Sequence, residues 1–283
     1  TFVGAVTGYS TTTGAYNTAL GSAALYSNTT ANYNTAVGYQ AGYNNTGATN
    51  SFLGALSGYG ITSGTHNVSL GFASNYSNQT GNYNVSVGDY ANGGNLAVGS
   101  SVGYVTAIGY AALQNNAGNS NTAVGYGSLS SNTSGANNTA LGQSALYSNT
   151  TASYNTALGY QAGYSMTTAS YGTYVGIQAG YNTAGAQNTF VGVQAGYYVS
   201  TGAKNTILGG YTGNQGGLDI RTASNYIVLS DGDGNPRGIF DNGGNFIVNT
   251  TSALGQITVK APAGGNTISM IGRASDGYTR LEA

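Results

Sequence analysis

The sequence predicts an all-β protein: a β-solenoid, or β-roll, of 16–17-residue coils, followed by a short non-repetitive β region. Two observations predict it. A glycine that follows an aliphatic residue recurs at nearly constant spacing, and the 16 Leu, 11 Ile, 17 Val and 6 Phe make up only about 18% of the 283 residues. So few aliphatic residues do not fill the core of an ordinary α/β enzyme. A narrow coil needs little more than one row of them.

The repeat is marked by the glycine of a recurring Asn-Thr-Ala-Leu/Val-Gly phrase, and self-similarity of this kind is typical of solenoids. The marks are Gly4, Gly21, Gly38, Gly54, Gly71, Gly88, Gly99, Gly109, Gly125, Gly142, Gly159, Gly176, Gly192 and Gly209. They predict about 14 coils in a repeat domain over residues 1–213. The spacing falls to 11 and 10 residues on either side of Gly99, which predicts short coils at 88–109 that narrow the rod or form a specialised site.

Each phrase predicts a strand, on which residues two apart share one face. The aliphatic column directly before the glycine and the Thr column two residues earlier are expected to point inward. The column between them, mostly Ala or Ser, is expected to point outward, although it also accepts Phe52, Tyr174, Phe190 and Ile207. On this interpretation, Asp in place of Leu141 or Leu158 would be buried and would abolish a cooperative melt.

The remaining columns predict corners, so that each coil contains two short strands and two corners. Asn suits a turn and can bond from coil to coil in a stacked column, and glycine supplies a positive φ or a close approach. Five residues after most marks comes a tyrosine: Tyr9, Tyr26, Tyr43, Tyr59, Tyr76, Tyr104, Tyr147, Tyr164, Tyr181 and Tyr197. Such a column can shield the backbone and join neighbouring chains, or it can stack on sugar rings; its spread along the rod favours the structural role.

Strict repetition ends near position 213, and we expect residues 214–283 to form a non-repetitive β-rich shaft with Asp/Asn-Gly turns. Asp231, Asp233 and Asn235 have the spacing of a calcium loop. Pro236 stands where such a loop needs glycine, and Asn242 where it needs a bidentate glutamate. A hairpin turn is the better interpretation.

Charge and composition exclude several function classes. The net charge is −1, all six Lys and Arg follow position 203, and Asp89 is the only charged side chain before it. Nucleic-acid binding needs a basic surface, so no nucleic-acid partner is expected. No apolar run is long enough to enter a membrane, and there is no Cys. The chain begins with Thr1 inside a repeat, and we expect it to be a piece of a longer protein.

Catalytic residues are equally scarce. His66 is the only histidine and occupies a corner column, and the only acid in the repeats is Asp89. A triad or a glycosidase carboxylate pair needs more than this. We therefore expect no enzyme and predict no catalytic, cofactor-binding or metal-ligating residues; the sequence does not identify receptor-binding residues.

Two phrases, residues 34–43 (NTAVGYQAGY) and 155–164 (NTALGYQAGY), resemble the repeats of bacteriophage tail fibres. They are similar, more distantly, to the left-handed β-roll heads of trimeric autotransporter adhesins, whose repeat is shorter. The stretches 230–235 and 241–245 resemble the segment that follows such repeats in tail fibres. The resemblance implies a homotrimeric extracellular fibre, on a virion or a cell surface, that attaches to a cell-surface glycan or protein receptor.

Three functions stay open. An adhesive tail fibre is the first. A self-assembling extracellular filament or bacterial surface adhesin is the alternative, since a neutral rod with apolar outer columns can associate with itself. An ice-binding solenoid is a remote third, because regular Thr ranks on a flat sheet could order water; the inward placement of the Thr column argues against it.

Overall fold

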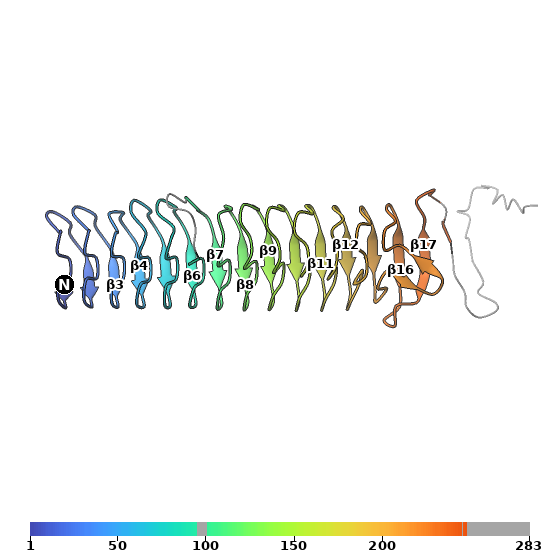
Figure 1. Ribbon diagram of the computed structural model, residues 1–283, viewed down its shortest axis with the longest axis horizontal. Helices are drawn as coiled ribbons and strands as arrows, with labels where there is room; N and C mark the ends of the chain where they lie inside the picture. Colours follow the sequence, from blue (N-terminus) through green and yellow to red (C-terminus); the bar gives the residue numbers. More distant parts are fainter. Residues whose placement is uncertain (95–100, 245, 248–283) are drawn as a thin grey trace, which may run out of the picture. The chain divides into compact units, whose positions relative to one another are not determined.

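The computed structural model describes residues 1–94, 101–244 and 246–247 and is a long β-solenoid (Figure 1). Fourteen strands stack in parallel, β1 to β13 and then β16, and β17 and β18 continue the same sheet in antiparallel orientation. Within the described ranges there is no helix. The predicted all-β solenoid with 16–17-residue coils and a short non-repetitive β region is therefore confirmed.

Each coil contributes one short strand to this sheet, and β14 and β15 form a separate two-stranded sheet. The strands are β1 (Phe2–Val3), β2 (Thr18–Leu20), β3 (Thr35–Val37), β4 (Ser51–Leu53), β5 (Val68–Leu70), β6 (Val85–Val87), β7 (Thr106–Ile108), β8 (Thr122–Val124), β9 (Thr139–Leu141), β10 (Thr156–Leu158), β11 (Thr173–Val175), β12 (Thr189–Val191), β13 (Thr206–Leu208), β14 (Asn214–Gln215), β15 (Leu218–Asp219), β16 (Ile227–Ser230), β17 (Pro236–Phe240) and β18 (Phe246–Ile247). The second strand predicted for each coil is absent from the described residues, where turns take its place.

The turns use left-handed backbone conformations. In the second coil, Ala23, Leu25 and Tyr33 have φ between 49° and 61°. The Ala23 N–H donates to the preceding coil, the Ala24 N–H to Gly21 of the same coil, and the Leu25 N–H to the following coil. The bonding between coils thus continues around the turns as well as through the strands, which stiffens the stack.

The glycine that marks each repeat is required by geometry. Gly21 has a φ of 133°, a conformation essentially limited to glycine. A Cβ there would lie 2.4 Å from the carbonyl oxygen of Gly38 in the next coil. The predicted roles of the glycine, a positive φ and a close approach, are both confirmed.

The predicted inward and outward faces of the strands are wrong. Ala140, at the middle of β9, is fully buried, whereas Thr139 and Leu141 on either side are exposed. In the other complete coils the middle residue is likewise buried and its two neighbours are exposed or half-buried, so Phe52, Tyr174, Phe190 and Ile207 are core residues. The interior is narrow and is filled by the middle residue of each strand together with residues of the opposite turn. The columns of Thr and larger aliphatic residues lie outside.

Where the middle residue of a strand is large, the facing position across the coil is a glycine. Where the middle of the strand is Ala19, the facing position six residues later is Leu25; where it is Phe52, that position is Gly58. A Cβ at Gly58 would lie 2.3 Å from the Phe52 ring. Interiors pack at nearly constant density, so a coil does not hold two large residues at these positions; beside Phe52, both Ala36 and Gly42 of the preceding coil are small, and the Phe52 ring lies against Gly42.

Buried asparagines tie the coils together, as predicted. Asn138 Oδ1 accepts from the backbone N–H of Asn155 (2.9 Å), and Asn138 Nδ2 donates to the carbonyl of Ala152 (2.8 Å). A second column forms an amide ladder, in which Asn149 Nδ2 donates to Asn132 Oδ1 at 2.8 Å and Asn132 Nδ2 to Asn116 Oδ1 at 2.7 Å. These bonds satisfy polar groups inside a core that has little apolar volume.

The predicted short coils at 88–109 are also wrong. β6 pairs directly with β7, with Val87 opposite Ile108. Gly88 and Gly109 therefore bound a single coil of 21 residues, which carries an insertion of about four residues. Gly99, taken as a repeat mark, lies in residues 95–100, outside the described part of the chain.

The sheet continues across the boundary predicted at 213/214. After β13 the small antiparallel pair β14–β15 intervenes, and β16 then adds to β13 in parallel. β16, β17 and β18 form the predicted antiparallel turn structure, and residues 1–249 make one compact unit. Residues 245 and 248–283 of the predicted shaft lie outside the described residues.

Candidate functional site

The outer face of the long sheet is one candidate surface. It presents a column of Thr beside a column of aliphatic side chains, and Leu20, Leu53, Leu141, Leu158 and Leu208 are each exposed by 43% to 50%. Strands spaced by about 4.8 Å make a face about 60 Å long. An apolar stripe of this length is typical of an interaction surface.

Tyrosines stack along the turns. One column runs through Tyr9, Tyr26, Tyr43, Tyr59 and Tyr76 with ring centroids 4.9–5.2 Å apart, and it resumes at Tyr147, Tyr164, Tyr181 and Tyr197. The sequence places Tyr104 in this column, and that prediction is wrong. Tyr104 stacks on Tyr83 at 5.5 Å in a second, corner column.

The first column is interrupted beside the 21-residue coil. The positions that follow Tyr76 are Gly93, Gln114 and Ser130. A cavity of about 400 Å³ opens at this gap and is lined by Leu56, Phe72, Ala73, Tyr76, Tyr90, Gly93, Gly94, Gln114 and Asn115. We call this cavity the Gly93 notch. A specialised site is one of the two interpretations of the irregular glycine spacing at 88–109. The notch is lined in part by Tyr90, Gly93 and Gly94, which lie in this range.

A second cavity, of about 390 Å³, flanks the same coil at the corner column. Its lining is polar apart from Tyr104: Gly81, Asn82, Ser101, Gly103, Tyr104, Asn119 and Ser120. Asn82 and Asn119 are already used, since Oδ1 of Asn82 accepts from the Thr65 N–H at 2.7 Å and Oδ1 of Asn119 from the Gly103 N–H at 2.9 Å. This cavity is less suited to a ligand than the notch.

His66 and Asp89 have separate structural contacts. His66 is exposed in the corner column, its ring stacks on Tyr83 at 4.9 Å, and its Nδ1 lies 3.1 Å from Thr65 Oγ1. Asp89 Oδ1 accepts from the backbone N–H of Phe72 at 2.8 Å. Each side chain therefore has its own partners, Thr65 and Tyr83 for His66 and Phe72 for Asp89, and the two do not form an acid–base pair.

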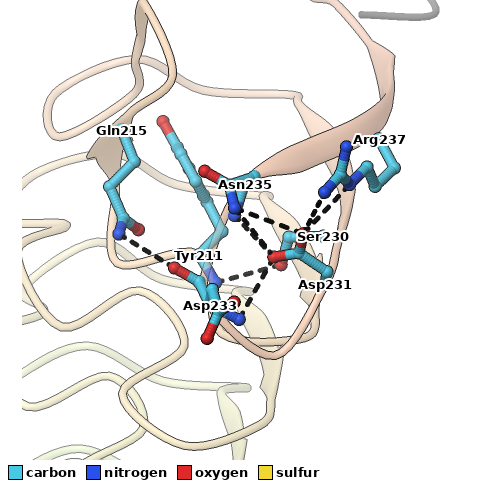
Figure 2. A network of polar contacts seen from close by, with 7 residues as sticks. All are labelled: Tyr211, Gln215, Ser230, Asp231, Asp233, Asn235 and Arg237. Atoms are coloured by element: carbon cyan, nitrogen blue, oxygen red, sulfur yellow. Dashed lines mark hydrogen bonds and ion pairs between the residues drawn. The ribbon is translucent and has the colours of Figure 1, made fainter. Parts of the chain in front are cut away.

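The turn with calcium-loop spacing joins β16 to β17 as a hairpin (Figure 2). Asp231 Oδ1 accepts from the backbone N–H groups of Asn235 and Asp233 (2.9 and 3.1 Å), and Oδ2 accepts from Arg237 Nε (3.0 Å). These contacts, the Asn235 N–H first and the Arg237 guanidinium next, lower the pKa of Asp231 to about 2. Both carboxylate oxygens of Asp231 thus accept hydrogen bonds within the turn, and Arg237 compensates the charge. These contacts agree with the hairpin interpretation.

The same region holds a buried tyrosine. Tyr211 Oη donates to the carbonyl of Leu218 at 2.8 Å. Its backbone N–H donates to Ser230 Oγ at 3.0 Å (Figure 2). Burial, with the nearby Asp219 carboxylate second, raises the pKa of Tyr211. These contacts fix the β14–β15 loop to the end of the solenoid.

Two further findings bear on function. Among the described residues, no three His, Cys, Asp or Glu side chains group closely enough to hold a metal ion. In the same ranges, no helix has the length and hydrophobicity needed to span a bilayer.

Comparison of the chain with protein-family models, with curated proteins and with solved structures gave no match.

Proposed function

We propose that this chain is a structural and adhesive fibre segment, of the kind that extends a bacteriophage tail fibre and attaches it to a host surface. The observation that carries the proposal is the rod itself: coil after coil is joined through backbone and asparagine bonds, with one continuous exposed sheet face. A stiff neutral rod projects a binding surface away from a bulky body, outside the cell. The proposal assigns it no catalytic role.

The sheet face supports self-association as a homotrimer. A strip about 60 Å by 10 Å offers roughly 600 Å² per copy, which approaches the ~800 Å² that each partner contributes to a standard interface. Three copies that meet along this face would bury the aliphatic column and leave the tyrosine stacks outside. Trimeric presentation raises avidity by about 10²–10⁴ even when each site is weak.

Attachment to cells tests the proposal. The labelled chain is mixed with a panel of Gram-negative and Gram-positive cells and measured by flow cytometry at about 0.1 M and about 0.5 M NaCl, where the Debye length falls from ~10 Å to less than half of that. Because the repeats carry almost no charge, attachment should persist at the higher salt. Failure to attach to any cells, or attachment lost at the higher salt, contradicts the adhesive mechanism. Long filaments of the isolated chain in negative stain would favour the filament alternative.

Ice binding is a second candidate, because the Thr column points outward. Thr18, Thr35, Thr139 and Thr156 are exposed and stand in register on parallel strands beside aliphatic side chains. The sequence-based argument against ice binding was that the Thr column points inward, and the exposed Thr side chains remove that argument. Thermal hysteresis of the chain in solution tests this candidate. Its presence in the wild type and loss in Thr139→Lys would replace the fibre proposal; its absence removes the candidate.

A further inference from the structure

The Gly93 notch lies beside Tyr76, at the first of the three positions of the tyrosine column that hold no ring, namely Gly93, Gln114 and Ser130. Tyr76 stacks on Tyr59 at 5.1 Å with an interplanar angle of 8°, so one face of its ring is covered. The opposite face is turned toward the next coil, where the column holds Gly93 instead of a ring. Tyr76 is thus the last ring of its stack and lines the cavity with its uncovered face.

Gly93 and Gly94 add no side chain to this gap. A Cβ at Gly93 would lie 2.1 Å from the carbonyl oxygen of Ala73, and a Cβ at Gly94 would lie 2.0 Å from the carbonyl oxygen of Gln114. Neither position accepts a side chain without movement of a neighbouring coil. The gap is therefore built into the fold of the 21-residue coil.

The size of the gap suits a single six-membered ring. Tyr76 and Gln114 are two coils apart, about 9.6 Å at the ordinary strand spacing. A ring placed midway would lie within van der Waals reach of both walls. The cavity volume of about 400 Å³ is at the small end of the range for ligand pockets.

The lining specifies a neutral, hydroxylated ligand. Phe72 and Tyr90, in edge-to-face contact at 5.4 Å, add apolar surface beside Tyr76. Gln114 and Asn115 supply amides on the other wall; Asn115 Nδ2 donates to the Ser130 carbonyl at 3.1 Å, and a Cβ at Gly94 would lie 2.8 Å from Asn115 Oδ1. None of the described lining side chains carries a charge at neutral pH, so none of them compensates an ionic ligand.

We infer that the Gly93 notch binds one uncharged pyranose unit of a surface glycan. The sugar stacks its C–H face on Tyr76 and shares hydrogen bonds with Gln114 and Asn115. This inference rests on the proposed adhesive function, for which it names the receptor class and the site. A single sugar in so open a site binds weakly, with a Kd on the order of 1 mM, and the repeated copies of a fibre supply the avidity.

Saturation-transfer NMR on the full chain tests the site with four defined probes: methyl α-glucopyranoside, methyl α-mannopyranoside, methyl β-galactopyranoside and N-acetylglucosamine. The wild type should transfer saturation to the ring protons of at least one probe. Tyr76→Ala and Gln114→Ala should each weaken that binding about five- to ten-fold, the loss expected for one aromatic contact or one hydrogen bond.

Tyr147→Ala is the matched control. Tyr147 is also the end ring of a stack, 5.3 Å from Tyr164, but it faces Ser130 and lies outside the cavity. This variant should bind as the wild type does. If Tyr76→Ala fails to fold, as judged by circular dichroism, the Gln114→Ala result decides. No transfer to any of the four probes, or an equal loss in Tyr147→Ala, overturns the site.

The cell-attachment assay separates the two proposals. A chain that binds a pyranoside but attaches to no cells overturns the adhesive function and leaves the site. A chain that attaches to cells equally well with and without Tyr76, and binds no pyranoside, overturns the site and leaves the adhesive function.

Discussion

At the residue scale, Ala140 and Leu141 distinguish the two faces of the strand. Ala140 is fully buried and Leu141 is 46% exposed, although the larger residue would ordinarily be expected inside. Asp at position 140 would bury an unpaired charge, which costs several kcal/mol, and should abolish the cooperative melt followed by circular dichroism. Asp at position 141 should leave the melt of an isolated chain nearly unchanged. The reverse order of effects would mean that the aliphatic column is the core.

The Asp231 turn predicts a local pH dependence. The folded pKa of about 2 lies below the ordinary value of an aspartic acid side chain, so this carboxylate stabilises the turn fully above pH ~4 and loses that contribution as the pH falls through ~2. Hydrogen exchange of the Asn235 amide should stay slow at pH 3 and become faster near pH 2. Asp231→Asn should exchange faster at neutral pH, without that transition. An Asn235 amide equally protected in the variant would show that the carboxylate does not hold the turn.

At the element scale, the large–small pairing across a coil predicts a compensating pair of substitutions. Phe52→Ala should destabilise the chain by about 3–5 kcal/mol through a cavity, and Gly58→Leu should destabilise it by overpacking. The double variant recreates the Ala19–Leu25 pair of the second coil, where Leu25 has a φ of 49° like that of Gly58, 59°. We expect it to recover at least half of the lost stability in urea unfolding. Additive losses would mean that the two positions do not share one core space.

The coil length and the asparagine ladders could be predicted from the sequence, because a fixed period fixes which residues stack. The faces could not be predicted from hydrophobicity, since the core column holds Ala and Ser as well as Phe52 and Tyr174. The usable signal was that a large residue in this column, such as Phe52 or Tyr174, is followed six residues later by glycine. The 21-residue coil was missed because residues 95–99 imitate the repeat phrase. That error also hid the gap at Gly93, by placing Tyr104 in the wrong tyrosine column.

At the scale of the whole molecule, the exposed sheet face is where copies of the chain should meet. Leu141 and Leu158 stand opposite each other on β9 and β10, in the aliphatic column of that face. Lysine at both positions would place two adjacent charges of each copy in an apolar interface, which costs far more in an assembly than on a free surface. Light scattering should give a trimer for the wild type and a monomer for Leu141→Lys/Leu158→Lys.

The double variant keeps its coils because both side chains lie outside the core, so its circular dichroism spectrum should match that of the wild type. Thr201→Lys supplies the control, since it adds a charge to an exposed turn away from the sheet face; that variant should remain a trimer. The monomeric variant should also attach to cells more weakly, because each copy then binds alone and avidity is lost. A wild-type chain that is monomeric at micromolar concentration would leave the face free for another partner. The homotrimer would then have to be abandoned, although the solenoid would not.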